Sequence, residues 1–216
     1  MARSSLHDRG ASIDRALRLF WARGYHATSL KDLEQALDMR PGSIYAAFGS
    51  KAGLFHRALD RYSQEMGEEF GTVIEGAASP VEGIRRYLRE VARACSTAGA
   101  DNEDGWPMPG CMLVKTILEI GDDDPEIRNR ADQVLAEVES KLAARLTQAK
   151  ALGELRADAQ PRRLARLVQA QIMGLRAFAQ RAVSARAVRE LGDDMGRVLD
   201  PYLAPGQDTD SSRLEH

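Results

Sequence analysis

The sequence has few cysteines, few aromatic residues and no long apolar run. Its two cysteines, Cys95 and Cys111, have neither metal-ligand spacing nor the density of a secreted disulfide framework, so we expect reduced thiols. No apolar run approaches the roughly 20 residues of a membrane span, and the first residues lack the apolar region of a secretory signal. These absences exclude a membrane protein and predict a cytoplasmic location.

Histidine is also scarce, which bears on catalysis. The four histidines are His7, His26, His56 and His216, and none forms a base–nucleophile pair at a sensible spacing. We therefore expect no enzyme, no catalytic residue, no metal and no cofactor. Residues 214–216 resemble the start of a purification tag and are left out of the functional reasoning.

The net charge of −2 conceals an asymmetry along the chain. Residues 1–61 contain ten Lys and Arg against six Asp and Glu, a net of +4, so the remainder carries −6. A basic first quarter on an acidic body indicates that the first quarter meets a polyanion. Scattered solvated charges would give the same count.

Apolar residues recur three and four positions apart almost throughout, and no segment alternates with the period of a strand. The pattern predicts an all-α protein of about nine helices. Pro41, Pro80 and Pro125 suit helix starts, because a proline in the first turn removes no hydrogen bond. Helices are expected to begin near residues 13, 30, 41, 50, 80, 111, 125 and 164, and a shorter one to end near 203.

Residues 30–40 and a helix from Pro41 form a helix-turn-helix candidate. Such a unit presents the first turn of its second helix to the major groove of DNA, and free N–H groups at helix starts favour phosphates. Arg40 has the planar fork that pairs with guanine, Tyr45 offers a hydroxyl to phosphate, and Lys51 adds charge at a helix start. Singly, each is also explained as a cap, a core aromatic or a solvated charge; together they favour DNA. The expected DNA-binding residues are Thr28, Ser29, Arg40, Pro41, Gly42, Ser43, Tyr45, Phe48 and Lys51.

Two segments here resemble the TetR family of one-component transcriptional regulators: "GYHATSLKDL" at residues 24–33 and "MRPGSIYAAFGSKAGLF" at residues 39–55. They follow the family's pattern of a Gly-aromatic turn, Thr-Ser, an apolar helix, Gly-Ser/Thr-apolar-Tyr, Phe and Ser-Lys. The resemblance implies a regulator whose C-terminal helices dimerise and enclose an inducer pocket. A dimer also has a physical logic, since two helix-turn-helix units held about 34 to 36 Å apart bind one face of DNA together.

Three residues depart from the family pattern. Asp38 stands where the family usually has Gly, so it must tolerate left-handed geometry if the turn is unchanged. Arg40 stands where a capping Ser or Thr is common, so the second helix is expected to lose that cap. Glu34 stands where Ala is frequent, and we expect it to be exposed.

The expected organisation is two domains and a tail. Residues 1–54 form a helix-turn-helix DNA-binding domain, residues 55–204 a helical ligand-binding and dimerisation domain, and residues 205–216 a disordered tail with the tag remnant. The last two long helices are the expected homodimer interface, because their apolar stripe is broad and Gly174 permits close approach. The alternative is that they only close the monomer core.

The expected inducer pocket draws on methionines and aromatic residues, which suit an adaptable apolar cavity. Residues of this kind at helical spacing are more often ordinary core residues, although Trp106 stands in a Gly-Pro loop outside the apolar stripes. The candidates are Tyr62, Met66, Phe70, Tyr87, Trp106, Met108, Cys111, Met112, Met173 and Phe178.

Cys111 lies in "GCMLV", residues 110–114, which resembles a GC-apolar-apolar-V segment of a subset of TetR-like proteins. Some members of that subset sense electrophiles or oxidants with this cysteine. The N–H groups of a helix start favour a thiolate there, whereas free cysteine is often simply buried. Both interpretations stay open at this point.

The sequence as a whole therefore predicts a dimeric transcriptional repressor. It would bind a palindromic operator in double-stranded DNA and be released by a small apolar or electrophilic ligand. The alternatives are a helical ligand-binding dimer without DNA binding and an enzyme that uses the same cavity.

Overall fold

The computed structural model describes residues 2–97 and 110–206 of the chain. These residues are mostly helical and contain no β-strand beyond one isolated bridge between Leu155 and Leu203. The all-α prediction is confirmed. The elements are α1 (Ala2–Arg23), α2 (Leu30–Leu37), α3 (Pro41–Phe48), α4 (Lys51–Glu75), α5 (Pro80–Thr97), α6 (Met112–Ile120), α7 (Pro125–Ala151), α8 (Pro161–Phe178), α9 (Ala185–Gly196) and a 3₁₀ turn, η1 (Arg197–Tyr202).

Helix starts follow local chemistry that the sequence displays. Pro41, Pro125 and Pro161 each occupy the first turn of a helix, where the missing N–H costs no hydrogen bond. Ser50 caps α4 by accepting a hydrogen bond from the Gly53 N–H at 2.9 Å. The order and placement of the helices therefore follow from short-range patterns.

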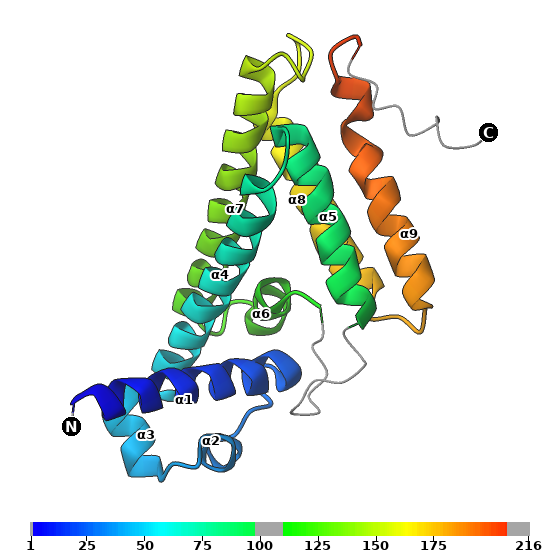
Figure 1. The fold of residues 1–216 in the computed structure, drawn as a ribbon. Helices are drawn as coiled ribbons and strands as arrows, with labels where there is room; N and C mark the ends of the chain where they lie inside the picture. Colours follow the sequence, from blue (N-terminus) through cyan, green and yellow to red (C-terminus); the bar gives the residue numbers. More distant parts are fainter. Residues whose placement is uncertain (1, 98–109, 207–216) are drawn as a thin grey trace.

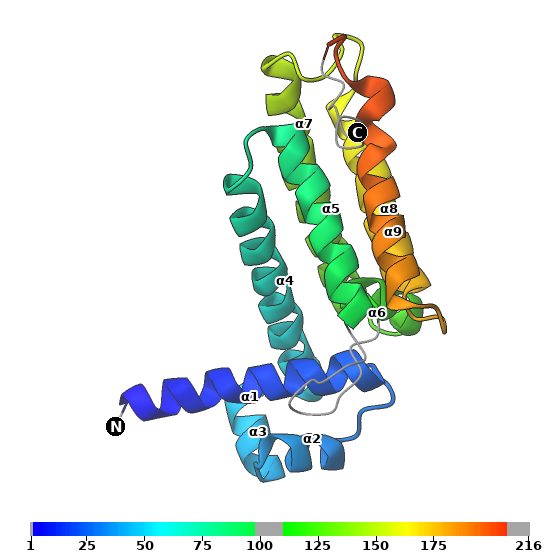
Figure 2. The same cartoon turned by 45° about the vertical axis from the view of Figure 1, so that its right-hand side comes forward.

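The helices form a small end piece and a larger bundle (Figure 1). Helices α1, α2 and α3 lie together at one end, and α4 leads away from them into a bundle with α5, α7, α8 and α9. Figure 2 shows α5 beside α9 and α1 crossing the lower end of the bundle. Helix α6 lies where the two parts meet.

Two apolar cores hold this arrangement together. The first core contains side chains from α1, α2, α3 and α4, together with α6 and the first half of α7. The second core contains side chains from the second half of α4 and from α5, α7, α8, α9 and η1. Helices α4 and α7 take part in both cores. The end piece is therefore packed against α6 and α7 rather than attached by a linker.

No described helix has the combination of length and apolarity needed to cross a bilayer. Residues 207–216, most of the predicted tail, lie outside the described residues.

Candidate nucleic-acid interface and interior polar cluster

The helix-turn-helix candidate folds as two short helices joined by a left-handed residue. Ser29 caps α2 and forms a capping box with Asp32, whose carboxylate accepts the Ser29 N–H at 2.8 Å. Asp38 ends α2 with φ 53° and ψ 46°, so the departure from Gly is accommodated by an Asp in the left-handed region. Glu34 is half-buried rather than exposed, which corrects that expectation.

The first turn of α3 is open to solvent. Arg40 occupies the N-cap without a side-chain cap hydrogen bond, as expected from the missing Ser or Thr. Arg40, Pro41, Gly42 and Ser43 are all exposed, and the Tyr45 side chain farther along the helix is 49% exposed. The early N–H groups of α3 and the Arg40 guanidinium can therefore meet a ligand from outside.

Three of the predicted contact residues are placed differently. Thr28 is fully buried, and its hydroxyl donates to the Gly24 carbonyl at 2.6 Å. The Thr28 side chain is therefore not exposed to a phosphate, and we no longer count it among the candidate DNA-contacting residues. Phe48 is half-buried against the core. Lys51 is half-buried with Nζ 4.4 Å from the centre of the Tyr25 ring, a cation–π contact that limits its reach.

Two arginines of α1 hydrogen-bond to the C-terminal ends of α2 and α3. Arg15 Nη2 donates to the Leu37 carbonyl at 3.2 Å, and Arg9 donates to the Ala47 carbonyl. Both contacts place a cation at a helix C-terminus, where the helix dipole favours it. Several basic residues that suggested polyanion contact therefore position α2 and α3, and sequence reasoning did not foresee this role.

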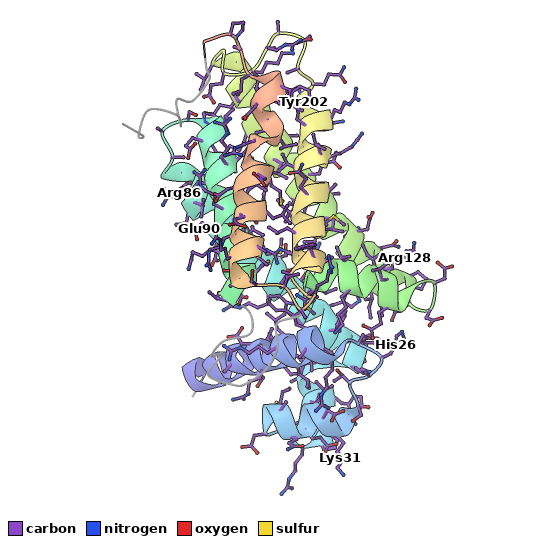
Figure 3. The ribbon with its side chains drawn as sticks, turned by 90° about the vertical axis from the view of Figure 1, so that its right-hand side faces the viewer. His26, Lys31, Arg86, Glu90, Arg128 and Tyr202 are labelled. Carbon is purple, nitrogen blue, oxygen red and sulfur yellow. The ribbon has the colours of Figure 1, made fainter. Side chains whose placement is uncertain are left out.

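Lys31 is an exposed cation that the sequence prediction omitted. It lies on α2 and points away from the bundle at the tip of the molecule (Figure 3). Lys31 lies in the first turn of α2, two residues after the N-cap Ser29, and this position could have identified it as a candidate DNA-contacting residue from the sequence.

Helix α6 connects the end piece to the bundle through two charged side chains. Lys115 Nζ donates to the carbonyls of Trp21 and Ala22, at 3.1 and 2.9 Å, at the C-terminus of α1. One turn later, the carboxylate of Glu119 accepts the N–H of Tyr25 at 3.1 Å and of His26 at 2.7 Å. A shift of α6 must therefore move the loop that leads into α2.

An interior polar cluster lies where α4, α5, α6 and α8 meet; its members are Tyr62, Tyr87, Cys95, Cys111 and Arg176. Arg176 Nη1 donates to Tyr62 Oη at 3.1 Å, and that hydroxyl donates to Cys111 Sγ at 3.8 Å. Burial raises the pKa of Tyr62 and raises that of Tyr87 to about 12. Both phenols are therefore neutral at pH 7. Arg176 is a member that sequence reasoning missed.

The remaining predicted pocket residues do not join one cavity. Met66, Phe70 and Tyr87 line a cavity between α4, α5 and α7 of about 10 Å³, which is room for no more than a water molecule. Met112 is fully buried in the core with α1 and α4, and Phe178 is half-buried near the end of α8, where Arg181 covers its ring at 5.0 Å. Trp106 and Met108 lie outside the described residues.

A larger, open groove of about 460 Å³ runs between α6 and α8. Its lining is mainly apolar and includes Cys111, Val114, Leu118, Met173 and Ala177. Cys111 belongs to both features, because it lines the groove and its Sγ contacts the Tyr62 hydroxyl inside. Among the described residues, no group of His, Cys, Asp and Glu is arranged to hold a metal ion.

Known proteins resemble both parts of the chain. The pattern of "Bacterial regulatory proteins, tetR family" matches residues 13–58, and "Tetracyclin repressor-like, C-terminal domain" matches residues 83–191. The HTH-type transcriptional repressor ComR of Escherichia coli (strain K12) is 27% identical over 190 residues, covering 88% of this chain and 87% of ComR. The HTH-type transcriptional repressor BdcR of the same strain is 33% identical over 122 residues, 56% of this chain and 57% of BdcR.

Solved structures share the fold across nearly the whole chain. A cysteine mutant of the TetR family transcriptional regulator CifR, complexed with 26-bp double-strand operator DNA, superposes with a TM-score of 0.78 at 30% identity. The match covers 88% of this chain and 95% of the CifR chain. With a C-terminal pattern that spans half of the sequence and this structural match, the chain belongs to the tetR family of bacterial regulatory proteins.

Proposed function

We propose that this protein is a transcriptional repressor that binds a palindromic operator as a homodimer and is released by a small apolar or electrophilic ligand. The observation that carries the proposal is the exposed first turn of α3, with Arg40 at the N-cap of this helix and Arg9 of α1 hydrogen-bonded to its C-terminal end. The names of ComR and BdcR as repressors, and the operator complex of CifR, support the same function. A protein that acts on operator DNA is also proposed to be cytoplasmic.

Homodimerisation is proposed to use α8 and α9. Leu167 and Gly174 are exposed and seven residues apart, so they share one face of α8. Among the residues the structure describes, no atom outside the local helix lies within 4 Å of a Cβ added at Gly174, which leaves room for a second helix to approach. Leu167→Glu is expected to shift the protein from dimer to monomer in size-exclusion chromatography with light scattering.

Ligand release is proposed to act through α6. The groove and Cys111 lie at the start of this helix, and Lys115 and Glu119 hold α1 and the following loop from the same helix. A ligand that moves α6 would therefore change how the two α3 helices of a dimer are spaced, and the spacing decides operator affinity. Reaction of Cys111 with an electrophile is one such perturbation.

DNA binding is tested by a gel shift on the protein's own promoter region at several salt concentrations. We expect sequence-preferring binding at moderate salt, weakening as salt rises because phosphate contacts release counterions. Binding without any sequence preference would favour the ligand-binding dimer instead. Mass spectrometry of native protein after mild electrophile treatment tests the thiol, and an unmodified Cys111 would exclude the electrophile route.

A further inference from the structure

Arg176 is a partly buried cation that forms no ion pair with a carboxylate among the residues the structure describes. Its guanidinium reaches from α8 to the buried hydroxyl of Tyr62 on α4, at 3.1 Å. Across residues 2–97 and 110–206, no Asp or Glu oxygen forms an ion pair with it. By contrast, the largely buried Arg85 pairs with Asp200 and also donates to the Gly196 carbonyl.

Two phenols and one thiol beside Arg176 are neutral. Burial raises the pKa of the Tyr62 and Tyr87 phenols and of the Cys95 thiol, so all three keep their protons at pH 7. Arginine itself stays protonated in proteins. The groups within the interior polar cluster that act on Arg176 are therefore hydroxyls and thiols, and the carboxylate that acts on the cluster, Glu69, raises the pKa of Tyr87 and Cys95 without an ion pair to Arg176. A partly buried cation of this kind favours an anion that can pair with it.

The open groove provides an approach to this charge. Cys111 separates the two, lining the groove on one side and contacting Tyr62 Oη on the other. Met173 and Ala177 of the groove flank Arg176 on α8, because Met173 stands three positions before it and Ala177 one position after it. Arg176 itself does not line the groove, and the carboxylate of Glu119, which does, already accepts two backbone N–H groups. A mainly apolar groove with a cation behind Cys111 matches a molecule with an apolar body and one anionic end.

The cation that lines the groove itself is already engaged. Lys115 lines it, but its ammonium donates to the carbonyls of Trp21 and Ala22. One available guanidinium suits a single negative charge, and its planar fork matches a carboxylate with two parallel hydrogen bonds.

We infer that Arg176 anchors the carboxylate of an amphipathic monocarboxylic acid, with the phenol of Tyr62 as a second donor and the groove between α6 and α8 around the apolar part. This deepens the proposed function, because it names the chemical class of the ligand that the repressor responds to. Binding of the acid replaces the Tyr62–Arg176 contact in part and displaces Cys111, the residue at the start of α6.

The test compares acids with their amides on the isolated protein. Isothermal titration calorimetry compares octanoate with octanamide, and 4-phenylbutyrate with its amide. The two members of each pair have the same apolar part, so the ratio of their affinities measures the preference for the charged end group. We expect the wild type to prefer the acid of at least one pair by about tenfold or more, the effect of one charge-assisted hydrogen bond. Arg176→Gln is expected to abolish that preference.

Two further variants separate anchoring from folding. Arg176→Lys keeps the charge without the fork, so it should retain a weaker preference for the acid. Arg181→Gln removes an exposed arginine near the end of the same helix and should leave the preference unchanged. Arg176→Gln should melt no lower than the wild type, because it removes a partly buried charge while it can still hydrogen bond to Tyr62.

The inference is overturned if neither acid is preferred to its amide, or if Arg176→Gln keeps the preference. These titrations need no DNA. If the protein shows no acid preference but still binds operator DNA, the role of Arg176 is wrong and the repressor function stands. If the gel shift shows no operator binding, the repressor function is wrong, and the titrations still decide the role of Arg176.

Discussion

The carboxylate of Glu119 on α6 accepts the backbone N–H of His26, at 2.7 Å, in the loop that leads from α1 into α2. The two residues are 93 positions apart in the sequence. Glu119 also accepts the N–H of Tyr25, and a Cβ added at Gly24 would lie 2.4 Å from its Oε2. This close fit makes α6 part of the support for the helix-turn-helix.

Glu119→Ala should destabilise the protein and weaken operator binding. The substitution removes a charged acceptor from two N–H groups of a partly exposed loop, so we expect the free energy of unfolding to fall by about 1–3 kcal/mol. Urea unfolding measures it. The neighbouring Leu118→Ala, at a side chain that is 78% exposed, should stay within about 0.5 kcal/mol of the wild type. Equal losses in both variants would contradict the role of the carboxylate.

Arg40→Ala and Tyr45→Ala should weaken operator binding in different ways. An arginine that pairs with guanine contributes about 1–3 kcal/mol of base discrimination, so Arg40→Ala should lower affinity and relax sequence preference. Tyr45→Ala should weaken binding by a similar factor on all sequences, because a phosphate contact carries no base information. Gel shifts on the operator and on single-base variants distinguish the two. Arg162→Ala, at the exposed start of α8, is the control and should bind normally.

Gly192→Ala should destabilise the contact between α5 and α9. A Cβ at Gly192 would lie 2.2 Å from the Cβ of Ala92, so the helices must separate, at a cost of about 1–3 kcal/mol. Gly71→Ala in α4 is the matched control, since no described atom beyond its local helix lies within 4 Å of the added Cβ. It should stabilise the protein by about 0.5–1 kcal/mol through helix propensity. Thermal unfolding of the two variants should therefore shift in opposite directions.

Asp32 should make the α2 capping box sensitive to acid. Hydrogen bonds from the side chain and backbone of Ser29, together with Arg23 at 2.6 Å, lower the pKa of Asp32 in the folded protein. A lowered folded-state pKa means that the stabilisation is complete above the unfolded value of about 3.9 and is lost as the pH falls through the folded value.

The measurement is the difference in unfolding free energy between the wild type and Asp32→Asn. It should be present at pH 6 and shrink below about pH 4. Asp193→Asn, at an exposed carboxylate of α9, gives the baseline. A difference that stays constant down to pH 3 would show that the carboxylate's charge is not what stabilises the cap.

Much of the fold follows from local pattern. The three- and four-residue spacing of apolar side chains, with proline at positions 41, 80 and 125, placed the helices in the right order. The left-handed turn at Asp38 and the uncapped start at Arg40 were also predicted and are confirmed. These features depend on residues within a few positions of each other, which a sequence displays directly.

The candidate ligand site was predicted less well. Tyr62, Tyr87, Cys111 and Met112 lie close together, but Phe178 lies near the end of α8, and Arg176 was missed. Methionines and aromatics at helical spacing look the same in a cavity wall and in a packed core. An arginine among many solvated arginines of α8 gives no local sign that it reaches Tyr62, 114 positions away.

By itself the sequence determined the helix order, the helix-turn-helix and the resemblance to the TetR pattern, because each depends on the spacing of residues that are close together in the chain. Only the tertiary structure decided which charges are free to act. It directed Arg15 to the end of α2, Lys115 and Glu119 to the loop before it, and Arg176 into the bundle. Those placements depend on how helices distant in sequence pack against each other, and packing rather than local preference sets the burial and partner of each charge.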